Sequence, residues 1–471
     1  MSQRRKFLLF LMPTIGRASL GFLVLPFSTY KLDAADFGLY ALATSVCGVG
    51  PALACAGSGY TLASHFSGLD GAARKSLVSS LLISSMLIGV CLSSLLLIGL
   101  LLWGDMSGLQ LSSSLILLIV LMAVMPIPWT YGVQIVTLDA KPEKYAVIQL
   151  GEALIASAVT LLGLYLFSLG VEALFVGALV GATFTAAGSL WVMRSYLGFS
   201  IDASWVRSTR VVGGLSVLSL LAEKTQELVE RSVVSFSIGL EQMGIYAHSQ
   251  QYRNIVGMGV KSAAYSLWPV SLEEARRSEM MFQRTKASWD MVALGVTSAG
   301  IAFSIFGEFL IGMLTHGKFS SAYVLAALWM IFILLQNTGK SQIAFLYAHG
   351  HGAGNQNAIT FSAVLAMLLL FFLAPIFGVA GVVASVFFQV ITYRLVLIYL
   401  AKRKSTLPFL DERMLGGACV VSVSLYFSAA YPSMEWRTLN LMISILGLIF
   451  VFLRQLRSLA GPTSRLFKDH K

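Results

Sequence analysis

Seven basic residues interrupt long apolar stretches of this sequence. They are Arg17, Lys224, Arg231, Arg253, Lys261, Lys340 and Arg394. A cation at bilayer depth costs about 2.5–3.5 kcal/mol on insertion scales, so it usually faces a cavity and usually has a function. Cations without a nearby acid favour an anion, and the planar fork of arginine suits phosphate in particular. The residue types therefore indicate a site for an anionic, phosphate-containing substrate.

These seven cations lie at different depths within their apolar stretches. The three near the centres are Arg17, Lys224 and Arg253. Arg231 falls towards the external end of its stretch, whereas Lys261 and Lys340 fall towards the cytoplasmic end. These six are the candidate substrate-binding residues. Arg394 is close enough to a cytoplasmic end for its charge to reach water, so we assign it a structural role.

Two of the stretches gather polar residues on one helical face. In the first, these residues are Glu223, Lys224, Gln226, Glu227, Glu230 and Arg231. At 100° per residue they span an arc of about 160°, which predicts a helix with one face towards water or protein and the other towards lipid. In the second, the residues are Tyr246, Gln250, Arg253, Gly257 and Lys261. They form a narrower stripe of about 80°.

Some of these cations have an alternative partner in the sequence. Lys224 and Glu227 are three residues apart, and Glu227 and Arg231 are four apart. Opposite charges at these spacings pair along one helix. Arg17 and Arg253 have no acid within one turn, so their alternative is an acid on another helix. The sequence leaves these alternatives open beside the anion site.

Acids inside the apolar stretches are candidates for coupling transport to an ion. The predicted coupling residues are Glu152, Glu227 and Glu230. Glu308 is a further lone acid that could relay a proton. Intramembrane carboxylates often form such relays, and a purely structural partner is the alternative for each.

The elements that carry these residues are predicted to be transmembrane helices. Of the 471 residues, 57% are apolar and 12% are charged, about half the charged fraction of a soluble protein. Runs long enough to span a bilayer recur along the chain, and the basic start followed by apolar residues is predicted to be a retained first helix. The fourteen predicted spans are 7–29, 37–64, 77–103, 113–136, 146–168, 173–193, 212–237, 244–267, 289–312, 322–347, 357–376, 381–400, 415–432 and 438–453.

The net charge of +11 is explained by topology rather than by binding of nucleic acid. With the N-terminus inside, the predicted cytoplasmic segments hold 23 of the 33 Lys and Arg residues, and the external segments hold 3. This is a clear positive-inside bias, and it predicts that both termini are cytoplasmic. The four cysteines all fall inside spans without metal or disulfide spacing, so we predict no metal and no cofactor.

Two short motifs repeat at nearly equal offsets. Residues 36–41 (DFGLYA) match residues 242–247 (QMGIYA) at an offset of 206, and residues 170–174 match residues 378–382 at an offset of 208. Each match joins span n to span n+6, as in transporters built from parallel repeats. We therefore predict a six-helix bundle at 1–200, a second at 211–404, two additional helices at 412–457 and a basic cytoplasmic tail at 458–471.

The chain resembles a family of transporters in two regions. Residues 25–40 are similar to the first hairpin of the polysaccharide-unit flippases, and residues 230–269 are similar to the seventh and eighth helices of that family. These O-antigen type, Wzx-like flippases belong to the multidrug/oligosaccharidyl-lipid/polysaccharide exporter superfamily. The span count and the duplication agree with the family along the whole chain.

This resemblance implies a function and a site. The family moves undecaprenyl-pyrophosphate-linked oligosaccharide across the bacterial inner membrane for O-antigen, capsule or exopolysaccharide synthesis, alongside a polysaccharide polymerase and a chain-length regulator. It implies a V-shaped cavity lined by helices 1, 2, 7 and 8, in which cations meet the pyrophosphate. Arg17 and Arg253 occupy matching places on helices 1 and 8. Helix 2 has no basic residue here, which departs from the cell-wall-precursor flippases.

Two other functions compete with the flippase. A multidrug antiporter of the same superfamily should present acids to cationic drugs, whereas the central positions here present cations. An integral-membrane polysaccharide polymerase or ligase needs a sizeable external segment for its catalytic residues, and every predicted external connection is short. The sequence therefore favours transport over catalysis.

Overall fold

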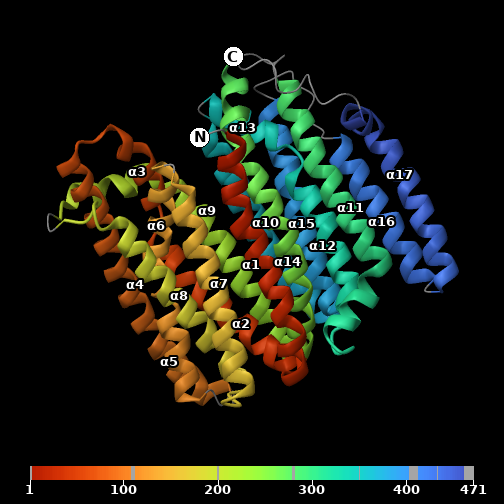
Figure 1. Cartoon of the computed structure of the whole chain (residues 1–471), viewed down its shortest axis with the longest axis horizontal. Helices are drawn as coiled ribbons and strands as arrows, with labels where there is room; N and C mark the ends of the chain where they lie inside the picture. The colour runs from red at the N-terminus through yellow and green to blue at the C-terminus, as the bar shows by residue number, and fades with distance from the viewer. Residues whose placement is uncertain are drawn as a thin grey trace. The chain divides into compact units, whose positions relative to one another are not determined.

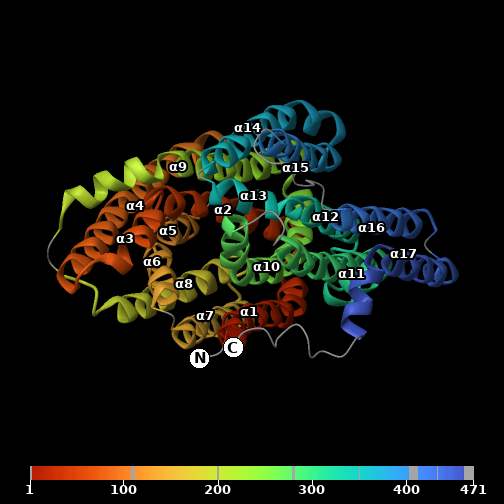
Figure 2. The same ribbon diagram turned by 90° about the horizontal axis from the view of Figure 1, so that it is seen from above.

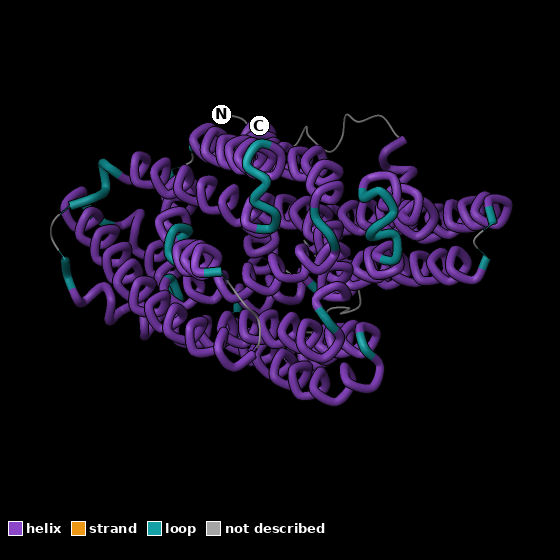
Figure 3. Tube along the Cα trace, turned by 90° about the horizontal axis from the view of Figure 1, so that it is seen from below, coloured by secondary structure: helices purple, strands orange, loops and turns teal. Residues whose placement is uncertain are grey.

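All the regular secondary structure that the computed structural model describes is helical, and loops and turns join the helices (Figure 3). These are residues 3–107, 112–139, 141–198, 201–277, 282–349, 351–402, 412–431 and 433–460. No strand occurs within these ranges. The predicted all-helical membrane fold is confirmed. The tail predicted at 458–471 lies mostly outside the described residues.

The chain divides into two compact units. One comprises residues 1–244 and 359–385, and the other comprises residues 245–358 and 386–471. Three helices run through the division, namely α10 (Leu240–Arg277), α14 (Gly352–Phe377) and α15 (Val379–Lys402). The domain boundaries given by the sequence duplication stay a prediction.

The first unit contains the helices up to α9. They are α1 (Gln3–Lys31), α2 (Ala34–Ala54), α3 (Ser58–His65), η1 (Phe66–Gly68), α4 (Gly71–Ser107), α5 (Ser113–Met122), α6 (Ile127–Leu138), α7 (Pro142–Tyr165), α8 (Glu172–Met193), α9 (Ala203–Val233) and the π-helical turn η2 (Val234–Ile238). The second unit contains α11 (Phe282–Leu314), α12 (Ala322–Asn337), α13 (Lys340–Ala348), α16 (Glu412–Ala430) and α17 (Met434–Ala460).

The fourteen predicted spans all appear as helices, and three of them are broken in two. The span at 37–64 forms α2 and α3, that at 113–136 forms α5 and α6, and that at 322–347 forms α12 and α13. Among the described residues, ten helices are long and apolar enough to cross a membrane. The chain is therefore a multi-pass membrane protein.

Among the described residues of the first unit, the most extensive helix packing joins α7 to α8. Gly177 and Gly181, four residues apart, face α7. A Cβ atom on Gly177 would collide with Thr160, and one on Gly181 would lie 3.0 Å from the Ala156 side chain. Small residues at this spacing let two transmembrane helices approach closely. This contact fixes the helix that carries Glu152.

The second unit is built around α11, α12, α16 and α17, which lie side by side (Figures 1 and 2). Two ion pairs hold the outer helices to α11. Arg413 on α16 lies 3.4 Å from Asp290, and Arg437 on α17 pairs with Glu308. The two helices after residue 412 thus belong to the same packed unit as α11 and α12.

The duplicated motifs meet each other in the first unit. A Cβ atom on Gly38 of α2 would collide with the carbonyl oxygen of Leu240, and one on Gly244 of α10 would collide with that of Ala34. Ala34 and Leu240 are 206 positions apart, as are Gly38 and Gly244. The contact between the first turns of α2 and α10 is therefore symmetric, with each glycine facing the backbone of the other helix.

Candidate functional site

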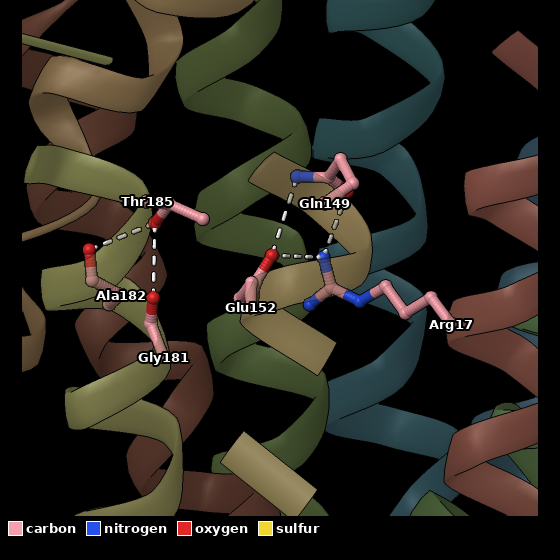
Figure 4. Close-up of polar contacts among 6 residues, drawn as sticks. All are labelled: Arg17, Gln149, Glu152, Gly181, Ala182 and Thr185. Carbon is pink, nitrogen blue, oxygen red and sulfur yellow. Dashed lines mark hydrogen bonds and ion pairs between the residues drawn. The ribbon is translucent and has the colours of Figure 1, made fainter. Parts of the chain in front are cut away.

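Arg17 is paired with an acid from another helix (Figure 4). Its Nη1 atom on α1 lies 3.0 Å from Oε2 of Glu152 on α7, and it also donates to Oε1 of Gln149 at 3.3 Å. Gln149 donates through Nε2 to the same Glu152 oxygen at 3.3 Å. The three side chains form a closed polar cluster, so the interhelical alternative considered for Arg17 is the one observed.

This cluster lies midway along two neighbouring helices. α1 packs along α7, and Gly16 allows close approach because a Cβ atom there would collide with Leu150. Nearer the end of both helices, Tyr165 Oη donates to the Phe27 carbonyl at 3.0 Å. Arg17 and Phe27 are ten residues apart, which corresponds to about 15 Å of helix. The ion pair therefore falls well inside the span.

A second ionic cluster lies on α9. Lys224 Nζ is 2.8 Å from Glu227 Oε2, and Arg231 Nη2 is 3.0 Å from Glu227 Oε1. Arg231 also donates through Nη1 to the Ala41 carbonyl of α2 at 2.7 Å. One carboxylate thus serves two cations along one helix, which is the intrahelical alternative that the sequence left open. The arginine additionally ties α9 to α2.

Arg253 has a different environment from these paired cations. Its Cζ atom lies 4.8 Å from the ring centroid of Trp329 and 5.2 Å from that of Phe332. Among the described residues of its own unit, no carboxylate pairs with it. Trp329 is fully buried and is held by a hydrogen bond from Nε1 to Ser249 Oγ at 2.9 Å. The guanidinium thus lies over two aromatic rings, which attract its positive charge through a cation–π interaction.

The other predicted cations lie elsewhere in the second unit. Lys261 is exposed on α10, and Lys340 is the first residue of α13, directly after the break at Gly339. Arg394 donates to the carbonyls of Leu335 and Gln336 near the end of α12. Arg394 thus has a structural role, as predicted, although it caps a helix end instead of extending to water.

The predicted coupling acids differ in their surroundings. Glu152 and Glu227 belong to the ionic clusters described above. Glu230 is buried on α9. Glu308, the further lone acid, pairs with Arg437. No three His, Cys, Asp or Glu side chains come together as metal ligands in the part of the chain that the structure describes.

An acid outside the spans joins two inter-helix segments. Asp139, directly after α6, accepts a hydrogen bond from Tyr196 Oη at 2.6 Å and pairs with Lys141 at 3.0 Å. The hydrogen bond to this carboxylate raises the pKa of Tyr196, and the same carboxylate raises the pKa of Lys141. The contacts tie the segment between α6 and α7 to the one that follows α8.

Three residues of these clusters were not predicted from the sequence. Gln149, Trp329 and Phe332 contact the predicted cations but carry no charge, and each lies far along the chain from its partner. A polar residue one turn before Glu152 was the available signal for Gln149. The two aromatic residues look like ordinary apolar positions of a span.

One comparison with known proteins identifies the family of this chain. The family model described as polysaccharide biosynthesis protein matches residues 4–273. Comparison with curated protein sequences gave no match.

The fold is similar to solved transporter structures. One is the lipid II flippase MurJ in an inward closed conformation, with a TM-score of 0.67 and 14% identity, covering 96% of this chain and 100% of that chain. Another is an inward-facing multidrug resistance MATE family transporter, with a TM-score of 0.55 and 14% identity, covering 88% and 99%. A mutant of the Vibrio cholerae MATE transporter VcmN has a TM-score of 0.54 and 12% identity, covering 85% and 96%.

The family match extends over more than half of the chain, from α1 into α10, and the fold agrees with these transporters over most of its length. The chain belongs to the polysaccharide biosynthesis protein family.

Proposed function

We propose that this protein is a flippase that moves an undecaprenyl-pyrophosphate-linked oligosaccharide from the cytoplasmic to the outer leaflet of the bacterial inner membrane. The family match supports a role in polysaccharide synthesis, and the fold supports transport. The sugar composition and the pathway, whether O-antigen, capsule or exopolysaccharide, lie beyond this proposal. The polymerase and chain-length regulator remain expected partners.

The observation that carries the proposal is the environment of Arg253. Its guanidinium lies over the rings of Trp329 and Phe332 and has no carboxylate partner among the described residues of its unit. The planar guanidinium carries several N–H donors in a fork, which is the geometry that grips a phosphate in two places. We assign Arg253 as the main diphosphate ligand.

The other cations have supporting parts in this proposal. Arg17, Lys224 and Arg231 each pair with a glutamate, so each must share or release that partner before binding a substrate anion. Lys261 and Lys340 supply positive charge elsewhere in the second unit. The predicted anion site thus depends more on Arg253 than the sequence suggested.

The membrane potential gives the transport a direction. An inside-negative potential contributes about 2.3 kcal/mol per charge per 100 mV. It favours outward movement of the anionic diphosphate. Transport then requires no catalytic residue, and the role of Glu152, Glu227 or Glu230 in ion coupling stays a prediction.

Complementation of a flippase-null strain tests the proposal. With Arg253→Ala, we expect export of lipid-linked glycan to fall about tenfold or more, because a hydrogen-bonded ionic contact to the diphosphate is lost. Arg253→Lys should give intermediate export, since it keeps the charge but not the planar fork. Accumulated intermediates are to be assayed on each leaflet at matched protein levels.

The control for this experiment is Arg437→Ala. Arg437 is also an arginine of the second unit, but it pairs with Glu308 near the end of α11. We expect export of lipid-linked glycan by the Arg437→Ala variant to stay close to the wild-type level once protein levels are matched. Undiminished export by the Arg253→Ala variant would refute the assignment of Arg253.

Export of cationic compounds is the second candidate function. The segment of α9 from Glu223 to Arg231 carries three glutamates and two basic residues, so its net charge is negative. A negative site attracts cations. Increased drug susceptibility of a deletion strain, with normal lipid-linked glycan on both leaflets, would favour this function over the flippase.

A further inference from the structure

We infer that Glu152 is a built-in substitute for the substrate anion: it occupies Arg17 while the protein is unloaded and yields Arg17 when a diphosphate binds. The inference rests on the proposed function. It assigns Arg17 as a conditional ligand and Glu152 as a positioning residue that sets substrate affinity.

Among the described residues, Arg17 is the only charged partner of Glu152. The carboxylate accepts from Arg17 at 3.0 Å and from Gln149 at 3.3 Å (Figure 4). The neighbouring helix α8 presents Gly181 to this side chain, so it offers no competing charge there. The cluster is neutral, which is the low-energy arrangement for charges inside a span.

The two partners differ in how accessible they are. The Arg17 side chain is 46% exposed, whereas the Glu152 side chain is 16% exposed. A ligand can therefore approach the guanidinium while the carboxylate stays behind it. Arginine also has a long side chain that can turn away from α7, whereas Glu152 is set where α7 packs against α8. The accessible member of the pair is the cation.

Gln149 makes the exchange feasible. It accepts from Arg17 and donates to Glu152, so it bridges both members of the pair. When Arg17 turns towards a diphosphate, Gln149 can keep its hydrogen bond to the carboxylate. A buried acceptor that retains one donor loses less free energy than one left without any.

Arg231 on α9 lacks this freedom. Glu227 holds Lys224 and Arg231 along the same helix, and Arg231 is also fastened to the Ala41 carbonyl of α2. Releasing Arg231 would break contacts on two helices. Of the two arginines that pair with a glutamate in the described part of the first unit, Arg17 is thus the better placed to change partners.

This exchange has two consequences for transport. Competition from Glu152 weakens substrate binding, because the diphosphate must displace a carboxylate. The same carboxylate neutralises Arg17 after release, so the unloaded protein does not carry an extra bare charge inside the span. Glu152 therefore raises the substrate concentration needed for half-maximal rate and speeds release and return.

The test is the flipping kinetics of Glu152→Gln in proteoliposomes. The probe is a short polyprenyl diphosphate that carries one fluorescent sugar. We expect the half-saturating probe concentration to fall about fivefold or more, because Arg17 is freed for the diphosphate. The maximal rate should fall as well, because release slows. A residue with only a structural role would not tighten binding when it is neutralised.

Three further variants make the result decisive. Glu152→Asp keeps the charge and should restore most of the wild-type kinetics. In an Arg17→Ala background, Glu152→Gln should leave the half-saturating concentration unchanged, since the competed cation is gone. Glu308→Gln removes another glutamate that pairs with an arginine on a different helix and should not tighten binding.

The outcomes separate this inference from the proposed function. If wild-type protein does not move the probe, the flippase proposal fails and the inference fails with it. If wild-type protein moves the probe but Glu152→Gln binds it no more tightly, the inference alone is overturned. If the Glu152→Gln variant folds poorly, the Arg17→Lys variant takes its place in the test. This variant changes the cation for which Glu152 and the diphosphate compete, so its half-saturating probe concentration should differ from that of the wild type. An unaltered half-saturating concentration would overturn the inference.

Discussion

At the residue scale, local spacing predicted some partners and not others. The pairs of Glu227 with Lys224 and Arg231 follow from separations of three and four residues on one helix. The pair of Arg17 with Glu152 joins residues 135 positions apart, and no local pattern indicates which helix will lie beside α1. The sequence therefore identifies the intramembrane charges, whereas tertiary packing decides which of them are neutralised.

Arg231 and Lys224 provide a stability prediction at this scale. Arg231→Ala removes an ion pair and the hydrogen bond that ties α9 to α2, so we expect a loss of about 1–3 kcal/mol. Lys224→Ala removes one partly exposed pair on a single helix and should cost less than about 1 kcal/mol. Thermal denaturation of the purified variants in detergent measures both. Equal losses would show that the contact with α2 does not stabilise the fold.

At the element scale, apolar length predicted the helices but not their interruptions. The breaks after α2 and α12 contain Gly57 and Gly339, whose φ angles are 78° and 74°. This left-handed conformation suits glycine. The break between α5 and α6 includes Pro126, directly before α6. These residues were visible in the sequence, but glycine and proline also occur within unbroken transmembrane helices, as Pro13 and Pro26 do in α1.

The Gly38 and Gly244 contact provides a prediction for the elements. Alanine at either position would force the first turns of α2 and α10 apart, so we expect each substitution to cost about 1–3 kcal/mol. The matched controls are Gly48→Ala on α2 and Gly257→Ala on α10, where a Cβ atom would meet nothing within 4 Å. The controls should be neutral or slightly stabilising, since alanine favours helix.

Thermal denaturation of the four glycine variants distinguishes these positions. Both contact variants should unfold at lower temperature than both controls. If Gly38→Ala and Gly244→Ala behave like Gly48→Ala and Gly257→Ala, the symmetric contact is not part of the folded protein. The duplication in the sequence would then lack the structural meaning assigned to it.

At the scale of the whole molecule, composition and charge distribution predicted the class of protein. The apolar runs required many transmembrane helices, and the fold agrees with those of a lipid II flippase and a multidrug resistance transporter. The orientation of the termini follows from the distribution of Lys and Arg and stays a prediction. Substrate identity does not follow from the fold, since the lipid II flippase and the multidrug resistance transporter share this architecture but are named for different cargo.

Leaflet-resolved flipping by the purified wild-type protein in liposomes tests the central claim most directly. The cargo is a polyprenyl-diphosphate-linked oligosaccharide, and its arrival in the opposite leaflet is followed over time. The account predicts movement well above that in protein-free liposomes, and faster movement when the potential drives the anion in the export direction. Movement no faster than in protein-free liposomes, whatever the potential, would contradict the account.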